Sequence, residues 1–161
     1  MDTLEFLKAN GVRLLHADKS EAISLGWWET TENLENIIGK TVWICDFRNS
    51  AKDIFGKPIR AIAPKQVAVC DAENAKKVIF YSPIYFREVG KNGKLKSTEI
   101  NAVDNTGFHA HAGASVQIFE DRDECVACYK KLLEKAIQER KAAMETVAAD
   151  IRKLEEEAAN L

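Results

Sequence analysis

The feature that most constrains this chain is its C-terminal segment, Asp121 to Leu161, which contains no glycine and no proline. The segment is rich in Ala, Glu, Lys and Leu, which have high intrinsic helix propensity. Asp121 stands three residues before Glu124, as in a capping box. We therefore predict one continuous helix of about forty residues, about 60 Å long at about 1.5 Å per residue. Such a helix exceeds the width of the small domain beside it.

Apolar residues recur along this segment in alternating steps of three and four, which places them on one stripe of the helix. The stripe comprises Val126, Leu133, Ile137, Met144, Val147, Ile151, Leu154 and Ala158. A partner helix is needed to cover it, so we expect a homo-oligomer, either a dimer or a higher assembly such as a hexamer. Lys130 and Arg140 interrupt the stripe. Each either extends to solvent along its aliphatic stem or meets an anion near the subunit interface.

The whole chain is predicted to adopt an α+β fold in three parts. Residues 1–38 form an N-terminal extension of short helices, of which the second begins at Thr31 and ends at Gly39. Trp27 and Trp28 lie between these helices and are expected to anchor them. Residues 39–120 form a β-rich, ligand-binding core with an antiparallel sheet, and residues 121–161 form the long oligomerisation helix.

Short β-type runs bounded by turn residues define the predicted sheet. They are TVWICDF, QVAVC, VIFY, IYFREV, TEINAV and SVQIF. Asn92-Gly93 predicts a type I′ turn, so the strands around Phe86 and Ile100 should pair. Pro58 and Pro64 bracket the run KPIRAIAPK, which we expect to be a surface loop because proline cannot donate to a sheet.

Composition excludes several classes of protein. The chain has 161 residues and a formal net charge of -2, which argues against a protein that coats nucleic acid. It has no apolar run of the roughly twenty residues that cross a bilayer and no basic, apolar leader, so we expect no membrane association and a cytoplasmic location. The four cysteines are spread over different elements, which favours free thiols over a disulfide framework.

Two groups of residues are candidates for ligand binding. In the run DNTGFHAHAG, Asn105 and Thr106 offer hydrogen bonds and Phe108 a stacking face, although the same residues also suit a turn that satisfies its own backbone. Basic and aromatic groups that suit phosphates and bases gather around the strands, or are simply solvated. They are Arg48, Arg60, Phe86, Arg87, Lys94 and Lys96.

A metal site and an active site are weaker hypotheses. His109 and His111, with Cys125 and Cys128, supply the ligand types of a zinc site, but cysteines on a helix are often small buried apolar groups, and we expect no metal. The sequence contains no nucleophile elbow, P-loop, Gly-x-Gly-x-x-Gly or His-Glu-x-x-His motif. We therefore predict a binding protein without a cofactor and not an enzyme.

Four runs of the sequence together resemble the phage Thoeris anti-defence sponge family, the first of that series. They are GKTVWICDFRN, YSPIYFREVGKNGK, INAVDNTGF and IFEDRDECVACY, and DNTGF with the strand-to-helix junction IFEDRDEC is the most specific part. The resemblance covers roughly Gly39 to Tyr129. It leaves residues 1–38 unaccounted for, and the rest of the helix matches in character alone.

The resemblance implies a β core with a C-terminal helix, an oligomer, and ligand sites shared between subunits. It implies capture of a cyclic nucleotide immune signal in the host bacterial cytoplasm: a cyclic ADP-ribose isomer made by a TIR-domain enzyme, and in some members cyclic oligonucleotides, without degradation. Arg48 and Lys96 would contact phosphate and Phe86 would stack. The complete candidate set is Arg48, Phe86, Arg87, Lys96, Asn105, Thr106, Phe108 and Lys130. The chain departs from the family where His109 and His111 replace an expected basic residue.

Three other functions remain open from the sequence. The first is a phage inhibitor that binds a host defence protein directly, as anti-CRISPR proteins do, through the exposed helix or the acidic residues Glu155 to Glu157. The second is a phosphodiesterase or nucleosidase that acts on similar ligands. The third is a nucleic-acid-binding accessory protein, which the near-neutral charge disfavours.

Overall fold

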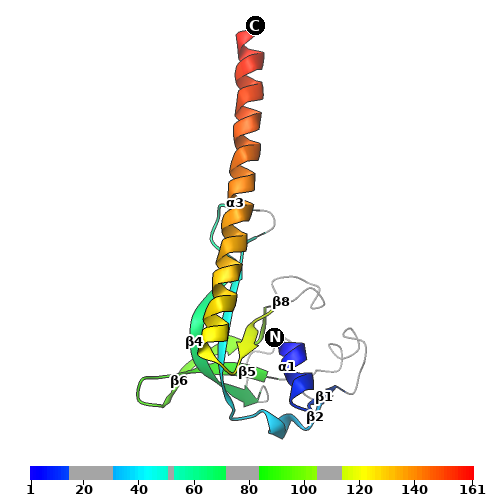
Figure 1. The fold of residues 1–161 in the computed structure, drawn as a ribbon, viewed down its shortest axis with the longest axis vertical. Coiled ribbons are helices and arrows are strands. Elements are labelled where there is room, and N and C mark those ends of the chain that lie inside the picture. The colour runs from blue at the N-terminus through cyan, green and yellow to red at the C-terminus, as the bar shows by residue number, and fades with distance from the viewer. Residues whose placement is uncertain (15–30, 51–52, 72–83, 105–113) are drawn as a thin grey trace.

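The computed structural model describes residues 1–14, 31–50, 53–71, 84–104 and 114–161. Figure 1 shows a β domain at one end and a single long helix that projects far beyond it. An antiparallel sheet, a short N-terminal helix and a long C-terminal helix make this an α+β fold, as predicted. The predicted strand VIFY, Trp27, Trp28 and the run 105–113 lie outside the described residues.

The main sheet has five strands in the order β6-β5-β4-β3-β9, and every neighbouring pair is antiparallel. Its strands are β3 (Thr41–Arg48), β4 (Arg60–Asp71), β5 (Ile84–Val89), β6 (Leu95–Asn101) and β9 (Gln117–Phe119). Two short ladders flank it: β1 (Arg13–Leu14) with β2 (Thr31–Glu32), and β7 (Val103–Asp104) with β8 (Ala114–Ser115). The β-branched runs of the sequence thus supply the interior strands.

The β5–β6 hairpin confirms the predicted pairing but not the predicted turn. Phe86 lies directly opposite Ile100. Gly93 has a φ of 76°, whereas Asn92 is not among the described residues with positive φ, so the turn is not type I′. Gly90 donates its N–H to Lys94 O at 2.8 Å and accepts from Gly93 N at 2.9 Å. These bonds close a longer loop with a glycine in the left-handed position, a common alternative hairpin connection.

Strand β4 corrects the prediction of a proline-bracketed surface loop. The strand begins at Arg60 and runs through Pro64. Proline is tolerated there for two reasons. The β3–β4 register shifts between Ile44 and Asp46, which face Lys65 and Ile62, so Pro64 lies at a bulge. In addition, β5 pairs with β4 only from Val67 onward, which leaves the Pro64 part of β4 as a sheet edge on that side.

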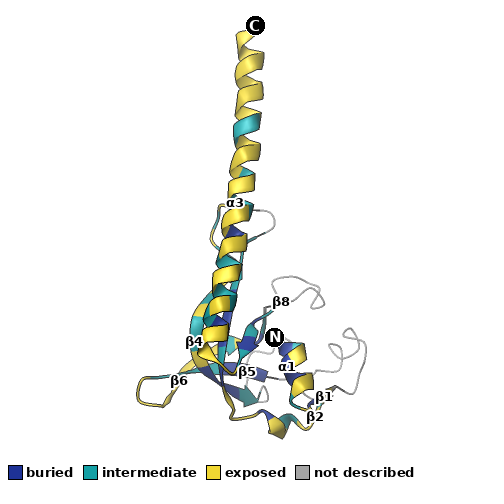
Figure 2. Cartoon of the chain, in the orientation of Figure 1, coloured by how far each residue is buried: buried dark blue, intermediate teal, exposed yellow. Residues whose placement is uncertain are grey.

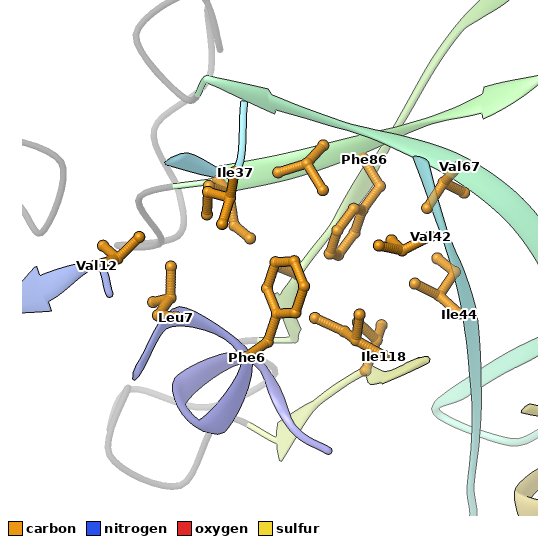
Figure 3. Close-up of a cluster of buried hydrophobic side chains, with 13 residues drawn as sticks. Phe6, Leu7, Val12, Ile37, Val42, Ile44, Val67, Phe86 and Ile118 are labelled. Carbon is orange, nitrogen blue, oxygen red and sulfur yellow. The ribbon is translucent and has the colours of Figure 1, made fainter. Parts of the chain in front are cut away.

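The N-terminal segment is part of the core and not a separate extension. Helix α1 (Thr3–Ala9) begins at Asp2 with a complete capping box and buries Phe6 and Leu7. Figure 3 shows these side chains, with Val12 and Ile37, packed in one cluster with side chains of the sheet. Because the sheet is small, its inner face needs this cover to exclude water.

The predicted helix over 31–38 is also corrected. The structure has strand β2 followed by a short 3-10 helix, η2 (Leu34–Asn36), which begins after Asn33 in the left-handed conformation. Thr31 therefore caps no helix. Gly39 does lie at the end of the segment with a φ of 85°, which a residue with a side chain rarely adopts.

Helix α3 (Arg122–Ala159) has 38 residues and confirms the predicted long C-terminal helix. Asp121 accepts a hydrogen bond from the backbone N–H of Glu124 at 3.2 Å, which caps its first turn. The first half of α3 packs against β3, β4 and β9 and buries Cys125 and Ala136. Figure 2 shows that the second half is almost wholly exposed. Within the described residues no helix has the length and apolarity to span a membrane.

Candidate functional site

A buried carboxylate organises the end of strand β3. Asp46 is 5% exposed, and its Oδ2 atom accepts hydrogen bonds from Arg60 Nε at 2.6 Å and from Arg48 Nη2 at 3.0 Å. Arg60 also donates to the backbone oxygen of Asn101 at 3.0 Å. One carboxylate thus faces two guanidinium groups, and the cluster carries one excess positive charge. Charge-assisted bonds of this kind fix the donors in place.

A cavity of about 340 Å³ adjoins this cluster, between the sheet and helix α3. Arg48 and Asn49 line it from the end of β3, and Lys135 lines it from α3. Ser115 on β8 and Gln117 on β9 add two more polar side chains to the lining of the cavity. The side chain of Arg48 is 25% exposed, and only its Nη2 atom is hydrogen-bonded within the described residues. Its remaining N–H groups are free to meet a ligand oxygen.

Asn49 carries a buried donor without an acceptor. Its Oδ1 atom accepts a hydrogen bond from Arg140 Nη2 at 3.1 Å, and this fixes which end of the amide is the oxygen. The Nδ2 atom is buried and has no hydrogen-bond partner among the residues that the structure describes. A buried donor left in this state costs about 1–3 kcal/mol, so this amide calls for an acceptor, either a water molecule or a ligand oxygen.

The contacts of Arg140 differ from both roles that the sequence suggested for it. We expected it either to extend to solvent or to meet an anion at a subunit interface. Instead it donates to Asn49 and to the backbone oxygen of Gly56, at 3.1 and 3.5 Å, and so joins α3 to the connection between β3 and β4. The sequence could not show this contact because 84 residues separate Arg140 from Gly56.

Phe86 is not a stacking surface. Its ring is fully buried in the centre of the hydrophobic core (Figure 3), so the role implied by the family resemblance is wrong for this residue. The alternation of β5 places Phe86 on the inner face of the sheet, where its large apolar surface contributes most to stability.

Arg87 and Lys96 lie away from the cavity. Arg87 donates to the backbone oxygen of Lys96 at 2.7 Å, and Lys96 pairs with Glu88 at 2.9 Å, so both stabilise the β5–β6 hairpin. Strand β6 is three places from β3 in the sheet, about 14 Å at about 4.8 Å per strand. Lys96 therefore does not line the cavity beside Arg48 in the described structure, and its predicted phosphate contact stays a prediction.

The remaining predicted site residues are not brought to the cavity by the described structure. Lys130 is exposed on α3 and is not among the residues that line the cavity. Asn105, Thr106 and Phe108 lie outside the described residues. Sequence reasoning missed Asn49 and Lys135. Asn49 directly follows Arg48 in the run GKTVWICDFRN, and Lys135 lies next to the buried Ala136, but neither signal is specific without the fold.

Three cysteines meet where α3 begins. The Cys45 thiol donates to the backbone oxygen of Cys125 at 3.6 Å, and burial together with the nearby Cys125 and Cys128 raises the pKa of Cys45. Burial also raises the pKa of Cys125. All four cysteines are free. Among the described residues no three His, Cys, Asp or Glu side chains are arranged to hold a metal, and His109 and His111 lie outside them.

No protein-family model matches the chain, and no curated protein or solved structure is significantly similar to it.

Proposed function

We propose that the chain is a non-catalytic binding protein that captures a small phosphorylated ligand beside Arg48. In line with the phage Thoeris anti-defence sponges that it resembles, the ligand is a cyclic ADP-ribose isomer, held and not degraded in the bacterial cytoplasm. The observation that carries the proposal is the guanidinium of Arg48, which lines the cavity with N–H groups that make no hydrogen bond within the described residues, beside Asn49, whose buried Nδ2 atom has no acceptor among those residues.

The charge of the cavity suits a phosphate. Lys135 and Glu139 line it with opposite charges, and Asp46 is shared between Arg48 and Arg60. One positive charge therefore remains in excess. A guanidinium held by a buried carboxylate keeps its remaining N–H groups oriented, which favours phosphate binding because less side-chain entropy is lost.

The described lining favours binding over catalysis. It contains no histidine or cysteine, and Asp46 is engaged by two guanidinium groups. Glu139 also lines the cavity, but no hydrogen bond joins it to Ser115 in the part of the chain that the structure describes. A hydroxyl without an adjacent base is a weak nucleophile, so the arrangement fits retention of an intact ligand.

The cavity volume, about 340 Å³, lies near the lower limit of known ligand pockets. It encloses the phosphates and an adjoining ribose more readily than a whole cyclic dinucleotide. The predicted base contacts of Asn105 and Phe108 lie outside the described residues and stay a prediction.

Calorimetric titration with cyclic ADP-ribose isomers tests the proposal. We expect Arg48→Ala to weaken binding about 10- to 100-fold, because a hydrogen bond to a charged group contributes about 1.5–3 kcal/mol. Asn49→Leu, which removes the unpaired donor, should weaken it about 5- to 10-fold. The matched control is Arg87→Ala, which removes an arginine of the distant β5–β6 hairpin and should leave affinity unchanged.

Two outcomes would reject the proposal. The first is the absence of binding of any isomer by the intact protein, or equal affinity in the Arg48 variant. The second is recovery of a chemically altered ligand by mass spectrometry after heat release, which would instead indicate a phosphodiesterase or nucleosidase.

A further inference from the structure

The second half of α3 presents a stripe of large apolar side chains to solvent. Met144, Val147, Ile151 and Leu154 follow one another at steps of three, four and three, and their exposed fractions lie between 49% and 65%. In Figure 2 this half of the helix projects beyond the β domain. No described residue outside the helix covers the stripe. Spacing of this kind is that of the seam between two paired helices.

The stripe lies beside the face that the sheet covers, since its member Ile137 is 49% exposed while the neighbouring Ala136 is buried. Cys125, Leu132 and Ala136 face the sheet or the cavity, and Arg140 follows one turn later, where it bonds to Asn49 and Gly56. Ile137, before Arg140, is already exposed, and one turn beyond Arg140 the stripe resumes at Met144. Up to Arg140 the helix packs against the rest of its own chain, whereas beyond the β3–β4 connection no described residue outside the helix covers it.

We propose that a second copy of this chain covers the stripe, with the two helices antiparallel and the two-fold axis crossing them at the level of Ala149, whose side chain points away from the seam. In this register Met144 packs against Leu154 of the partner subunit, and Val147 packs against Ile151 of the partner subunit. Each stripe residue meets an apolar residue, and the contact is self-complementary, as two-fold symmetry requires. The proposal does not depend on the ligand.

Arg140 decides between the two possible orientations. It occupies a seam position, since it lies four residues before Met144 and seven before Val147. A parallel pair would place Arg140 opposite Arg140 of the partner subunit, with two guanidinium groups in the same layer. The antiparallel pair places it opposite Ala158 of the partner subunit, whose methyl group leaves room for the bonds that Arg140 makes to the β3–β4 connection.

The charges that flank the stripe favour the same orientation. In the antiparallel register Lys141 faces Glu155 of the partner subunit, and symmetry makes this two attractive pairs; Asp150 faces its own copy in one unfavourable pair. In a parallel pair Asp150 faces Glu155 of the partner subunit twice, and no opposite charges meet at these positions. Charges beside a helical seam set partner orientation in this way.

The β domain limits the extent of the contact. The antiparallel overlap runs from Arg140 to Ala158, about 28 Å at about 1.5 Å per residue. It ends where the β3–β4 connection begins to cover the helix. A shift by one heptad toward the C-terminus would shorten the overlap and place Asp150 opposite Glu157 of the partner subunit. In the proposed register the end of the partner helix also reaches the neighbourhood of Phe55, which is 52% exposed and precedes Gly56.

Sedimentation equilibrium at low ionic strength tests both the occupant and the orientation. We expect the full chain to be a dimer and Glu155→Lys to weaken it about 10- to 30-fold, because two attractive pairs become repulsive. The double variant Lys141→Glu/Glu155→Lys should restore the affinity. The matched control is Glu156→Lys, which makes the same charge change on the outer face and should alter the dimer less than 3-fold.

A dimer that becomes stronger with Glu155→Lys would contradict the antiparallel orientation. A parallel pair would be strengthened by Glu155→Lys, because Asp150 would then face lysine. If the chain stays monomeric at about 100 μM, a second copy does not cover the stripe, and its partner is a different protein. Circular dichroism of each variant should show unchanged helicity, which separates lost pairing from lost folding.

Discussion

The two halves of helix α3 share the spacing of one apolar stripe but have different surroundings. From Arg122 to Arg140 the helix lies on β3, β4 and β9 and contributes Lys135 to the cavity beside Arg48. From Lys141 to Ala159 it makes no contact with the sheet, yet its apolar residues keep the same spacing. The comparison shows that regular spacing reports a buried face without saying whether the chain itself or a second molecule buries it.

Truncating one isoleucine in each environment gives the largest expected contrast. Ile118 is 1% exposed within the core, so Ile118→Ala should lower the free energy of unfolding by about 2–5 kcal/mol. Ile151 is 49% exposed on the distal stripe, so Ile151→Ala should change monomer stability by less than about 0.5 kcal/mol while weakening association. Urea unfolding at low protein concentration measures the first effect and sedimentation the second. Equal loss of monomer stability in both variants would mean that the chain itself buries the distal stripe.

The thiols packed at the covered half of α3 should make the stability of the protein depend on pH. Burial raises the pKa of Cys45 and of Cys125 in the folded state. A raised pKa means that the folded state holds a proton which the unfolded state releases at lower pH. The stabilisation is complete below the ordinary thiol pKa of about 8.5 and is lost as pH rises above it, by up to about 1.4 kcal/mol per pH unit for each thiol.

Thermal unfolding between pH 7 and pH 10 checks this linkage. The intact protein should lose stability more steeply than Cys45→Ala, and the difference should grow above about pH 8.5. Leu154→Ala serves as the control from the distal half and should follow the slope of the intact protein when measured at low concentration. A Cys45 variant with an unchanged slope would contradict the inferred pKa direction.

The sequence predicted the parts of the fold that depend on local pattern. The long helix, its cap at Asp121, strand β3 and the pairing of Phe86 with Ile100 all follow from propensity, spacing or turn residues. The sequence misled where tertiary context decides. Pro64 is accepted in β4 because of a bulge and a missing neighbour strand, and residues 1–38 contribute Phe6 and Leu7 to the core.

The candidate site was predicted only in part, for a physical reason. The sequence singled out Arg48 because it ends a strand in a polar, basic environment, and the structure places it beside a cavity; its ligand contact stays a prediction. Its neighbours Asn49 and Lys135 were missed because their grouping depends on how α3 crosses the sheet. Phe86 was misassigned because an aromatic residue in a strand suits a core and a stacking surface equally well until the buried face is known.

Small-angle X-ray scattering of the full chain tests most directly whether the distal half of α3 joins two copies. An antiparallel pair places the two β domains at opposite ends of the joined helices, with centres about 55 Å apart at about 1.5 Å per residue. We predict a distance distribution with a second maximum near this value that disappears on dilution or with Ile151→Asp. A concentration-independent profile with a single maximum would contradict the account.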